Sequence, residues 1–443
     1  MTIPARGVAR TVARRALRVV LASAANVLIA HALRPDGRGH YAVITTVAFT
    51  GIVIGHFSVE RTQISLWERA ERRQALSVNA PALGLAAGTA AAVLGGVLAL
   101  LGALPARPAL LLVALLAVPF GAVTVNLTAI ALLRARVELV NRSAIAAGAV
   151  QCGSAAVLAA TGRLTLPAAI LCWTVAMIVP APLLARALRP LPPRAFDPRL
   201  ARHQLRVAAR YHPGLVAFHL LLIIDVLLLH ARHSPAAAGV YAIAVGLLEL
   251  TRIPGESVAQ VALARQAADD LPAAALLTAR AVRLGVVLSC CSAGLLALAS
   301  PLLIPLVYGR AFAGAVAPLA VLAPGMVALI AMRPLEQHLV RLGRPVLMTS
   351  IALAALAANV LLNLALIPPL GATGAALVSC ATYICMAVAE AAWFLGATGL
   401  AARELLPRRA DLAFAGRAVR AGLRRAAERR VPRRAAAERD PVR

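Results

Sequence analysis

The chain has 443 residues, 61% of them hydrophobic, and a formal net charge of +27. Soluble domains are about 45–50% apolar, so this composition excludes an ordinary soluble enzyme and indicates an all-α polytopic membrane protein. All 45 basic residues are Arg, which excludes Lys-dependent sites such as a Walker A loop or a Schiff base. Because the Arg residues flank apolar segments, we expect them to meet the membrane surface and not nucleic acid.

The first residues, 1–18, are Arg-rich and amphipathic, and we expect the apolar run after them to be an uncleaved first span. Apolar segments of spanning length then recur, and about 20 residues are enough for a helix to cross the hydrocarbon core. We predict twelve transmembrane helices, at residues 16–33, 41–59, 80–104, 109–133, 143–161, 165–188, 208–231, 239–260, 283–307, 314–334, 345–367 and 371–398.

Arginine alternates between the connections of these helices. The connections after every second helix are rich in Arg, whereas the others contain only Arg34, Arg38, Arg107, Arg163, Arg232 and Arg310. Arg-rich connections stay in the cytoplasm, so we place both termini there, in a multi-pass protein of the plasma membrane. The Arg-rich tail, residues 401–443, keeps Leu412, Val419 and Leu423 on one helical face, and we expect it to lie on anionic lipids.

The outer connections are too short to fold into a catalytic domain, and the sequence contains no HExxH, GxSxG or GxGxxG motif. The six Cys residues lie within apolar spans and form no CxxC pair. We therefore expect a protein that is not an enzyme and that has neither a metal site nor a cofactor.

A short repeat divides the spans into two sets of six. Residues 39–43 read GHYAV and residues 239–243 read GVYAI, 200 positions later, each at the start of a helix that leaves the outer face. After six spans the chain is back on the side of the membrane from which it started, so the two halves would have the same orientation in the membrane. We predict two six-helix lobes around a central cavity, residues 1–195 and 196–400, followed by the tail 401–443.

The predicted helix 239–260 contains three charges, Glu249, Arg252 and Glu256, which lie on one helix face at spacing i, i+3, i+7. A charge at the centre of a spanning helix costs roughly 2.5–3.5 kcal/mol, so this stripe must face protein or water. Pro254 and Gly255 interrupt the helix beside it. The stripe is either the polar wall of a transport cavity or an ion pair that only fixes helix packing.

Asp225, in the middle of the seventh span, is a candidate for a cavity function, because an intramembrane carboxylate is expensive to keep there. Glu60 and Arg61, at the end of the second span, are either site residues or interfacial charges. The candidate substrate-binding residues are Arg252, Glu249, Glu256, Asp225, Arg61 and Glu60. We expect Arg333, Glu336 and His338 on the surface, and Glu390 at a helix contact.

Several motifs carry a family resemblance. Residues 33–42, LRPDGRGHYA, resemble the L-G-P-E-G-R-G-x-Y-A segment after the first helix of bacterial polysaccharide biosynthesis flippases. These flippases belong to the multidrug/oligosaccharidyl-lipid/polysaccharide (MOP) exporter superfamily. Arg34 departs from the usual Gly, and Asp36 from Glu. Further segments resemble the family in order, over about residues 10–398: Asp225 with 238–242 (AGVYA), 306–309 (LVYG), 343–345 (GRP), 359–363 (NVLLN) and 371–376 (GATGAA).

The resemblance implies two lobes that alternate between inward- and outward-open states and move an undecaprenyl-pyrophosphate-linked oligosaccharide to the outer leaflet. The anionic head group needs a hydrated cavity with Arg donors, which Arg252 and Arg61 would supply, while Glu249, Glu256 and Asp225 would position them or carry protons. A glycan polymerase or glycosyltransferases would be its protein partners.

Two alternatives stay open. One is a cation-coupled drug antiporter of the same fold, against which an aromatic content of 4% argues. The other is a non-transporting membrane partner of a glycan-synthesis complex.

Reporter fusions at Pro235 and Val442 test the topology. The Arg bias puts Pro235 outside and Val442 in the cytoplasm. Alkaline phosphatase should therefore be active only when fused after Pro235, and green fluorescent protein should fluoresce only after Val442. Reporters on the same side of the membrane would contradict the twelve-helix topology.

Overall fold

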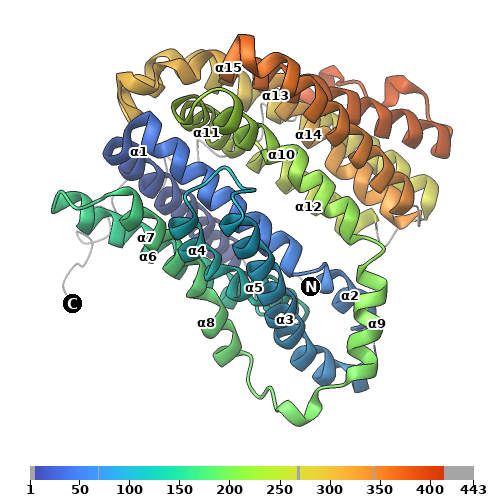
Figure 1. Cartoon of the computed structure of the whole chain (residues 1–443). Coiled ribbons are helices and arrows are strands. Elements are labelled where there is room, and N and C mark those ends of the chain that lie inside the picture. The colour runs from blue at the N-terminus through green and yellow to red at the C-terminus, as the bar shows by residue number, and fades with distance from the viewer. Residues whose placement is uncertain (1–4, 68, 267–269, 343–344, 414–443) are drawn as a thin grey trace, which may run out of the picture.

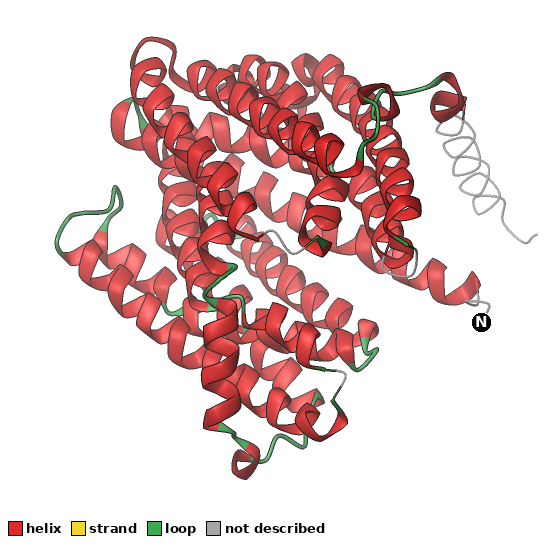
Figure 2. Ribbon diagram, turned by 90° about the vertical axis from the view of Figure 1, so that its right-hand side faces the viewer, coloured by secondary structure: helices red, strands yellow, loops and turns green. Residues whose placement is uncertain are grey.

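The computed structural model describes residues 5–67, 69–266, 270–342 and 345–413, which form helices joined by short turns, without a strand in these ranges (Figure 2). The first predicted half contains α1 (Ala5–Gly55), α2 (Val59–Leu66), α3 (Arg73–Leu100), α4 (Pro108–Leu115), α5 (Ala117–Leu133), α6 (Val137–Ala160), α7 (Leu166–Ile178) and α8 (Pro180–Ala187). The second contains α9 (Pro198–Ala208), α10 (His212–Arg232), α11 (Pro235–Leu250), α12 (Ile253–Gln266), α13 (Leu271–Tyr308), α14 (Val316–Arg341) and α15 (Pro345–Thr398).

Two long helices contain a kink that divides each of them into two spans. The backbone leaves helical geometry at Arg34 in α1 (φ 56°, ψ 178°), directly before Pro35, and at Gly371 in α15 (φ 54°, ψ −133°), after Pro368 and Pro369. Proline removes a backbone donor and crowds the preceding turn, so it favours a kink. Three pairs of consecutive helices, α4 with α5, α7 with α8 and α11 with α12, each count as one span, and α2 and α9 are too short to cross a membrane by themselves. When each kinked helix counts as two spans, the described residues then hold the twelve expected spans.

The outer surface of the helices suits a lipid environment. On α13 four leucines at helical spacing, Leu295, Leu298, Leu302 and Leu306, are each at least 70% exposed. Apolar side chains this exposed would aggregate in water, whereas acyl chains solvate them. The all-α polytopic architecture predicted from composition is therefore confirmed.

The helices form two groups that meet along α1, α10 and α11 (Figure 1). α3 to α8 pack with α1 around a core that includes Ile29, Ile44 and Leu111. α10 to α15 surround a second core that includes Leu221 and Tyr241. The residue boundaries given above for the two lobes stay a prediction. We call the end that carries α2 and α9 the Arg-rich end, and the end with the kinks the Arg-poor end.

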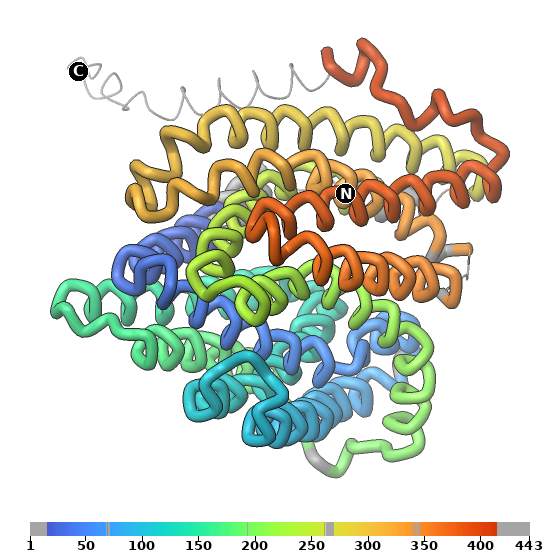
Figure 3. The backbone as a smooth tube through the Cα atoms, turned by 45° about the horizontal axis from the view of Figure 1, so that its top comes forward, coloured from blue at the N-terminus to red at the C-terminus, as the bar shows by residue number. Residues whose placement is uncertain are grey.

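The glycines of the sequence repeat hold the two groups together at the Arg-poor end. A Cβ added to Gly39 would lie 1.7 Å from the carbonyl oxygen of Pro235, and one added to Gly239 would lie 2.1 Å from that of Pro35. Figure 3 shows the blue tube of α1 beside the yellow-green tube of α11. The backbones of α1 and α11 therefore touch where only glycine fits, as in close contacts between membrane helices.

Several predicted boundaries are wrong; the span predicted to start at 80, for example, begins at Arg73, and two others have a clear local cause. The span predicted at 239–260 begins at Pro235, where Ser234 caps it, and it bends by 43° between Leu250 and Ile253, just before the Pro254 that the sequence suggested as the break. The span predicted to start at 283 begins at Leu271, because the Asp270 carboxylate caps the amide of Ala273.

The tail begins with contacts to α13. The guanidinium Nε of Arg283 lies 3.0 Å from a carboxylate oxygen of Asp411, and both side chains are at most 10% exposed. Glu404 pairs with the same Arg283 at 3.8 Å. These ion pairs fix residues 402–411 to the Arg-rich end. Val419 and Leu423, on which the amphipathic tail was predicted, lie outside the described residues.

Replacement of Gly239 by Ala tests the helix contact. The added Cβ forces α1 and α11 apart, and overpacking of this kind costs about 1–3 kcal/mol. We expect Gly239→Ala to lower the melting temperature of the purified protein. The matched control is Gly294→Ala on α13, where nothing lies within 4 Å, and it should be at least as stable as the native chain because Ala favours helix. Equal melting temperatures of both variants would contradict the contact.

Candidate functional site

The structure brings the three charges of the predicted stripe together at the bend between α11 and α12. The Arg252 guanidinium lies 3.2 Å from a carboxylate oxygen of Glu256 and 4.0 Å from one of Glu249. The Arg252 side chain is 12% exposed, whereas Glu249 is 60% exposed. Two carboxylates therefore balance the charge of one largely buried guanidinium. Their attraction offsets the free-energy cost of removing that guanidinium from water. Whether the stripe also binds substrate stays a prediction.

Asp225 lies apart from this stripe, in a buried polar network. Its Oδ2 accepts hydrogen bonds from the hydroxyls of Tyr241 and Ser379, the latter at 2.8 Å. Asn359 donates to Ser379 at 3.3 Å and accepts from Asn363 at 2.8 Å. These side chains are fully buried or nearly so, and they connect α10, α11 and both halves of α15. The network holds a carboxylate inside the second group, and a role of Asp225 in binding stays a prediction.

Glu60 and Arg61 have different surroundings at the Arg-rich end. The Glu60 carboxylate lies 3.0 Å from Nδ1 of His56, four residues earlier in the turn between α1 and α2. Arg61 instead lines a cavity of about 110 Å³, which we call the Arg61 cavity. Residues of α10, α14 and α15 form its other walls, so it lies where the first group meets the second.

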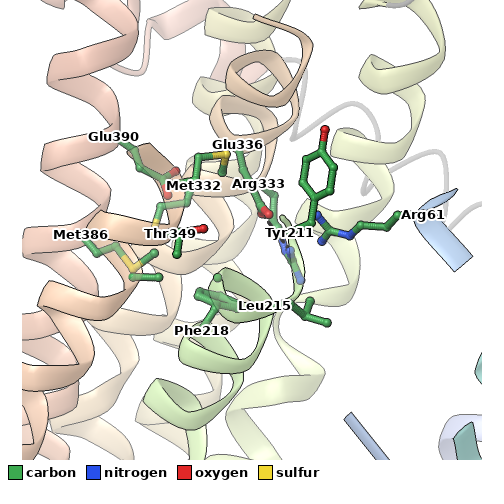
Figure 4. Close-up of a pocket in the computed structure, with 13 residues that line it drawn as sticks. Arg61, Tyr211, Leu215, Phe218, Met332, Arg333, Glu336, Thr349, Met386 and Glu390 are labelled. Atoms are coloured by element: carbon green, nitrogen blue, oxygen red, sulfur yellow. Dashed lines mark hydrogen bonds and ion pairs between the residues drawn. The ribbon is translucent and has the colours of Figure 1, made fainter. Parts of the chain in front are cut away.

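Charged and apolar side chains share the wall of the Arg61 cavity (Figure 4). Arg333 and Glu336 of α14 pair at 3.0 Å, and the Arg333 guanidinium lies 5.7 Å from the ring centre of Phe218. Arg61 lies beside Tyr211. Glu390 of α15 is 1% exposed, and its Oε2 has no hydrogen-bond partner in the described structure. Apart from Thr349, the remaining wall is apolar, with three methionines: Met332, Met348 and Met386.

A second cavity, of about 360 Å³, lies between α1 and α11, and we call it the Arg38 cavity. Its polar wall consists of Arg18, Ser23, Asn26, Arg38, Glu249 and Tyr308. Glu249 is thus the one residue of the predicted stripe that lines either of these two cavities. Gly39, which contacts Gly239, is the residue after Arg38. The cavity therefore ends on the Arg-rich side of the point where α1 and α11 touch.

Arg38 is a buried cation without a buried anion. Its side chain is 8% exposed, Nη2 donates to Oδ1 of Asn26 at 3.2 Å, and the guanidinium lies 5.0 Å from the ring centre of Tyr41. Nε has no partner, and no carboxylate of the described residues lies within ion-pair distance. An uncompensated buried charge is unfavourable, so this guanidinium is suited to an anion that enters the cavity.

The sequence did not identify four cavity residues. Arg333, Glu336 and His338 were expected on the surface and Glu390 at a helix contact. His338 is instead only 1% exposed, and the other three line the Arg61 cavity. Arg38 was counted only as a charge of an Arg-poor connection. The position of Glu390 within an apolar span was the one available signal, since such carboxylates mark functional sites. In the ranges that the structure describes, no three His, Cys, Asp or Glu side chains could together hold a metal ion.

Solved structures of membrane transporters resemble this chain along most of its length. The lipid II flippase MurJ, in an inward closed conformation, matches with a TM-score of 0.70 and 13% identity over 88% of both chains. An inward-facing MATE family transporter of the MOP superfamily matches with a TM-score of 0.67 and 14% identity, over 86% of this chain and 94% of that one. The chain has the fold of the MOP-superfamily transporters.

A third match shows that this fold accepts different pockets. A MOP superfamily transporter from Pyrococcus furiosus, described as having a binding pocket of reverse polarity, matches with a TM-score of 0.62 and 13% identity, over 87% of this chain and 93% of that one. Neither a protein-family profile nor a curated protein sequence matches the chain. The fold expected from the resemblance is confirmed. Because proteins with this fold have pockets of different polarity, the substrate of this chain has to be inferred from the side chains that line its own cavities.

Two variants with Leu substitutions test whether the three charges of the stripe stabilise the protein only when all three are present. Arg252→Leu removes the guanidinium between Glu249 and Glu256, so we expect a lower melting temperature. The triple variant Glu249→Leu, Arg252→Leu, Glu256→Leu should recover most of the loss, because replacing a complete set of ion-pair partners by apolar residues leaves no charge without a partner and is often neutral or stabilising. A triple variant less stable than Arg252→Leu would contradict this.

Proposed function

We propose that this MOP-fold protein moves an undecaprenyl-pyrophosphate-linked oligosaccharide from the inner to the outer leaflet of the plasma membrane, for polysaccharide export. One observation carries the proposal: the buried Arg38 guanidinium faces a cavity between the two groups of helices, and no carboxylate of the described residues, Glu249 on the same wall included, lies within ion-pair distance of it. The fold supports transport by alternating access, and the charge supports an anionic substrate.

A pyrophosphate fits this guanidinium chemically. Arg presents parallel N–H groups that bind two phosphate oxygens at once, and charge-assisted hydrogen bonds of this kind are stronger than neutral ones. Asn26, Glu249 and Tyr308 on the same wall offer hydrogen-bonding groups to sugar hydroxyls. The polyprenyl chain needs no pocket, because it can stay among the acyl chains while the head group moves between the lobes.

The two cavities supply guanidinium groups at both ends of such a path. We infer that the Arg-rich end faces the cytoplasm, so Arg61 would meet the head group first and Arg38 would hold it below the closed contact of Gly39 and Gly239. The stripe of Glu249, Arg252 and Glu256 would form the wall between them. Partnership with a glycan polymerase or glycosyltransferases, and the alternative of a non-transporting partner, stay predictions.

A second candidate, a cation-coupled drug antiporter, is favoured by the Arg61 cavity alone. Its carboxylates Glu336 and Glu390 lie among methionines and Phe218. Such a wall suits an amphiphilic cation, because thioether side chains adapt to varied apolar shapes. The pairing of Glu336 with Arg333 weakens this candidate, since the cation would have to displace a guanidinium.

Charge-neutral Arg variants test the proposed substrate. Arg38→Gln removes hydrogen bonds from a charged donor, each worth about 1.5–3 kcal/mol, and should weaken binding of undecaprenyl pyrophosphate about 10–100-fold. The measurement is titration of this lipid into protein held in nanodiscs, together with complementation of glycan export in cells. The matched control is Arg163→Gln, an exposed residue at the Arg-poor end, which should bind like the native chain.

Equal affinity of Arg38→Gln and the native chain would contradict the proposal. So would tight binding of a hydrophobic cation that Glu390→Gln abolishes, which would favour the antiporter instead.

A further inference from the structure

α9 connects the two groups of helices and packs beside α2 and α3 at the Arg-rich end (Figure 1). One of its faces is buried and consists of Leu200, Ala201, Gln204 and Ala208. The opposite face is exposed and basic, with Arg199, Arg202, His203 and Arg206. A helix that follows one membrane span and precedes another, with such a basic face, presents its guanidinium groups to lipid head groups.

Buried amides fix α9 to the first group of helices. Nδ2 of Asn79 on α3 donates to the carbonyl oxygen of Asp197 at 3.0 Å, and the N–H of Asp197 donates to Oδ1 of Asn79 at 3.1 Å. Nδ2 of Asn79 also donates to Oε1 of Gln204 at 3.3 Å, and Nε2 of Gln204 donates to the Thr62 hydroxyl of α2 at 3.5 Å. Asn79, Gln204 and Thr62 are at most 1% exposed. The position of α9 against α2 is therefore set within the first group.

A cavity of about 470 Å³ lies between the end of α2 and the start of α9, and we call it the Arg199 cavity. Its cationic groups come from both sides. Arg69 and Arg72 contribute from the turn that contains η1 (Ala70–Arg72), and Arg199 contributes from α9, where His203 lies one helical turn later. The other wall residues are Leu66, Asp197 and Leu200. Three guanidinium groups from two segments of the chain thus surround one space.

These three guanidinium groups have no counter-charge in the described part of the chain. Asp197, the one acid of the wall, accepts the backbone N–H groups of Arg199 and Leu200 at 2.8 and 3.0 Å and so caps α9. Glu71 is exposed and does not line the cavity. No described carboxylate lies within ion-pair distance of any of the three. Like charges around one space repel each other, so an anion between them stabilises the arrangement.

Apolar side chains beside the cavity place it at the level of lipid head groups. Ile64 on α2 is 59% exposed, and Phe196, which precedes Asp197, is 42% exposed. Trp67 directly follows Leu66 of the wall, and Trp is enriched where a membrane meets water. A basic cavity with exposed apolar neighbours matches a phospholipid, which joins a charged head to acyl chains. A soluble phosphate would use only the basic part.

We propose that the Arg199 cavity binds the phosphodiester head group of an anionic phospholipid, such as phosphatidylglycerol, from the leaflet at the Arg-rich end. Arg69, Arg72 and Arg199 would hold the phosphate oxygens, because Arg presents paired N–H donors to phosphate. The acyl chains would lie against Ile64 and Phe196. Phosphatidylethanolamine suits the site less well, since the same guanidinium groups repel its ammonium. The site is complete within the first group and does not rest on the proposed transport function.

Lipid titration followed by native mass spectrometry tests the site. The full chain in a neutral detergent receives dioleoylphosphatidylglycerol or dioleoylphosphatidylethanolamine, and the fraction of protein with bound lipid gives the affinity. The triple variant Arg69→Gln, Arg72→Gln, Arg199→Gln loses charge-assisted hydrogen bonds, so we expect it to bind phosphatidylglycerol about 10–100-fold more weakly. Phosphatidylethanolamine should bind the native chain and this variant equally. Equal binding of phosphatidylglycerol to both would overturn the proposal.

The matched control removes three exposed arginines that do not line the cavity. Arg202→Gln, Arg206→Gln, Arg210→Gln lie on α9 or directly after it, and this variant has the same net charge as the first one. The Arg-rich tail is the same in both, so it contributes equally. The control should bind phosphatidylglycerol like the native chain. An equal loss in the two triple variants would overturn the proposal, because diffuse surface charge would then account for the binding.

Competition with glycerol 1-phosphate separates a lipid site from a general phosphate site. This molecule has the phosphate of the head group without the acyl chains, so it should displace phosphatidylglycerol only at a large excess. Displacement at equal concentrations would overturn the assignment of a phospholipid.

Titration with undecaprenyl pyrophosphate separates this proposal from the proposed function. Arg38→Gln should bind phosphatidylglycerol like the native chain, because Arg38 lies in a different cavity. Binding of phosphatidylglycerol without binding of undecaprenyl pyrophosphate supports the lipid site and overturns the proposed substrate. If the Arg199-cavity variant loses undecaprenyl pyrophosphate but keeps phosphatidylglycerol, the cavity belongs to the path of the substrate and the lipid site is overturned.

Discussion

The backbone contact between Gly39 and Gly239 is the constraint on which the arrangement of the two groups of helices depends. No side chain fits on either residue, because the carbonyl oxygens of Pro35 and Pro235 already occupy the space. The contact fixes the position of α1 along α11, and with it the neighbours of the next residues. Arg38 then faces the cavity beside α11, and His40 meets His230 on α10. Close packing at one point thus sets the register of the polar groups between the lobes.

The charges of the membrane-spanning part are of two kinds. Arg252 and Asp225 have partners within the protein: two carboxylates balance the charge of Arg252, although its Nε has no hydrogen-bond partner, and hydroxyls of other helices donate to Asp225. They stabilise their surroundings only when all partners are present. Arg38 has an amide and an aromatic ring beside it but no anion. A charge that the fold buries and leaves uncompensated is available to a ligand, and for this reason Arg38 indicates the substrate better than the stripe does.

The boundary between the two groups of helices is partly apolar and partly polar. The core around Ile44 lies within the first group, whereas the core around Leu221 also includes Ala30, Ala42 and Val43 of α1. Beside these apolar residues, the contact of α1 with α10 uses hydroxyls and imidazoles, as in Thr50 with His219. Hydrogen bonds of this kind can be replaced by hydrogen bonds to water if the groups separate, whereas the apolar contacts of α1 in the second core would be lost.

The sequence by itself determined the span count, the membrane class and the fold, because apolar length, Arg bias and the repeated GxYA segment are local patterns. It also identified Arg61 and Glu60 as polar residues at a span end. It could not show that Glu249 lines the cavity of Arg38, or that Ser58 bridges His56 to His212, 154 residues further along. Those contacts depend on how helices cross, which hydrophobic periodicity does not encode. Only the tertiary structure decided which buried charges have partners, since partners come from helices distant in the chain.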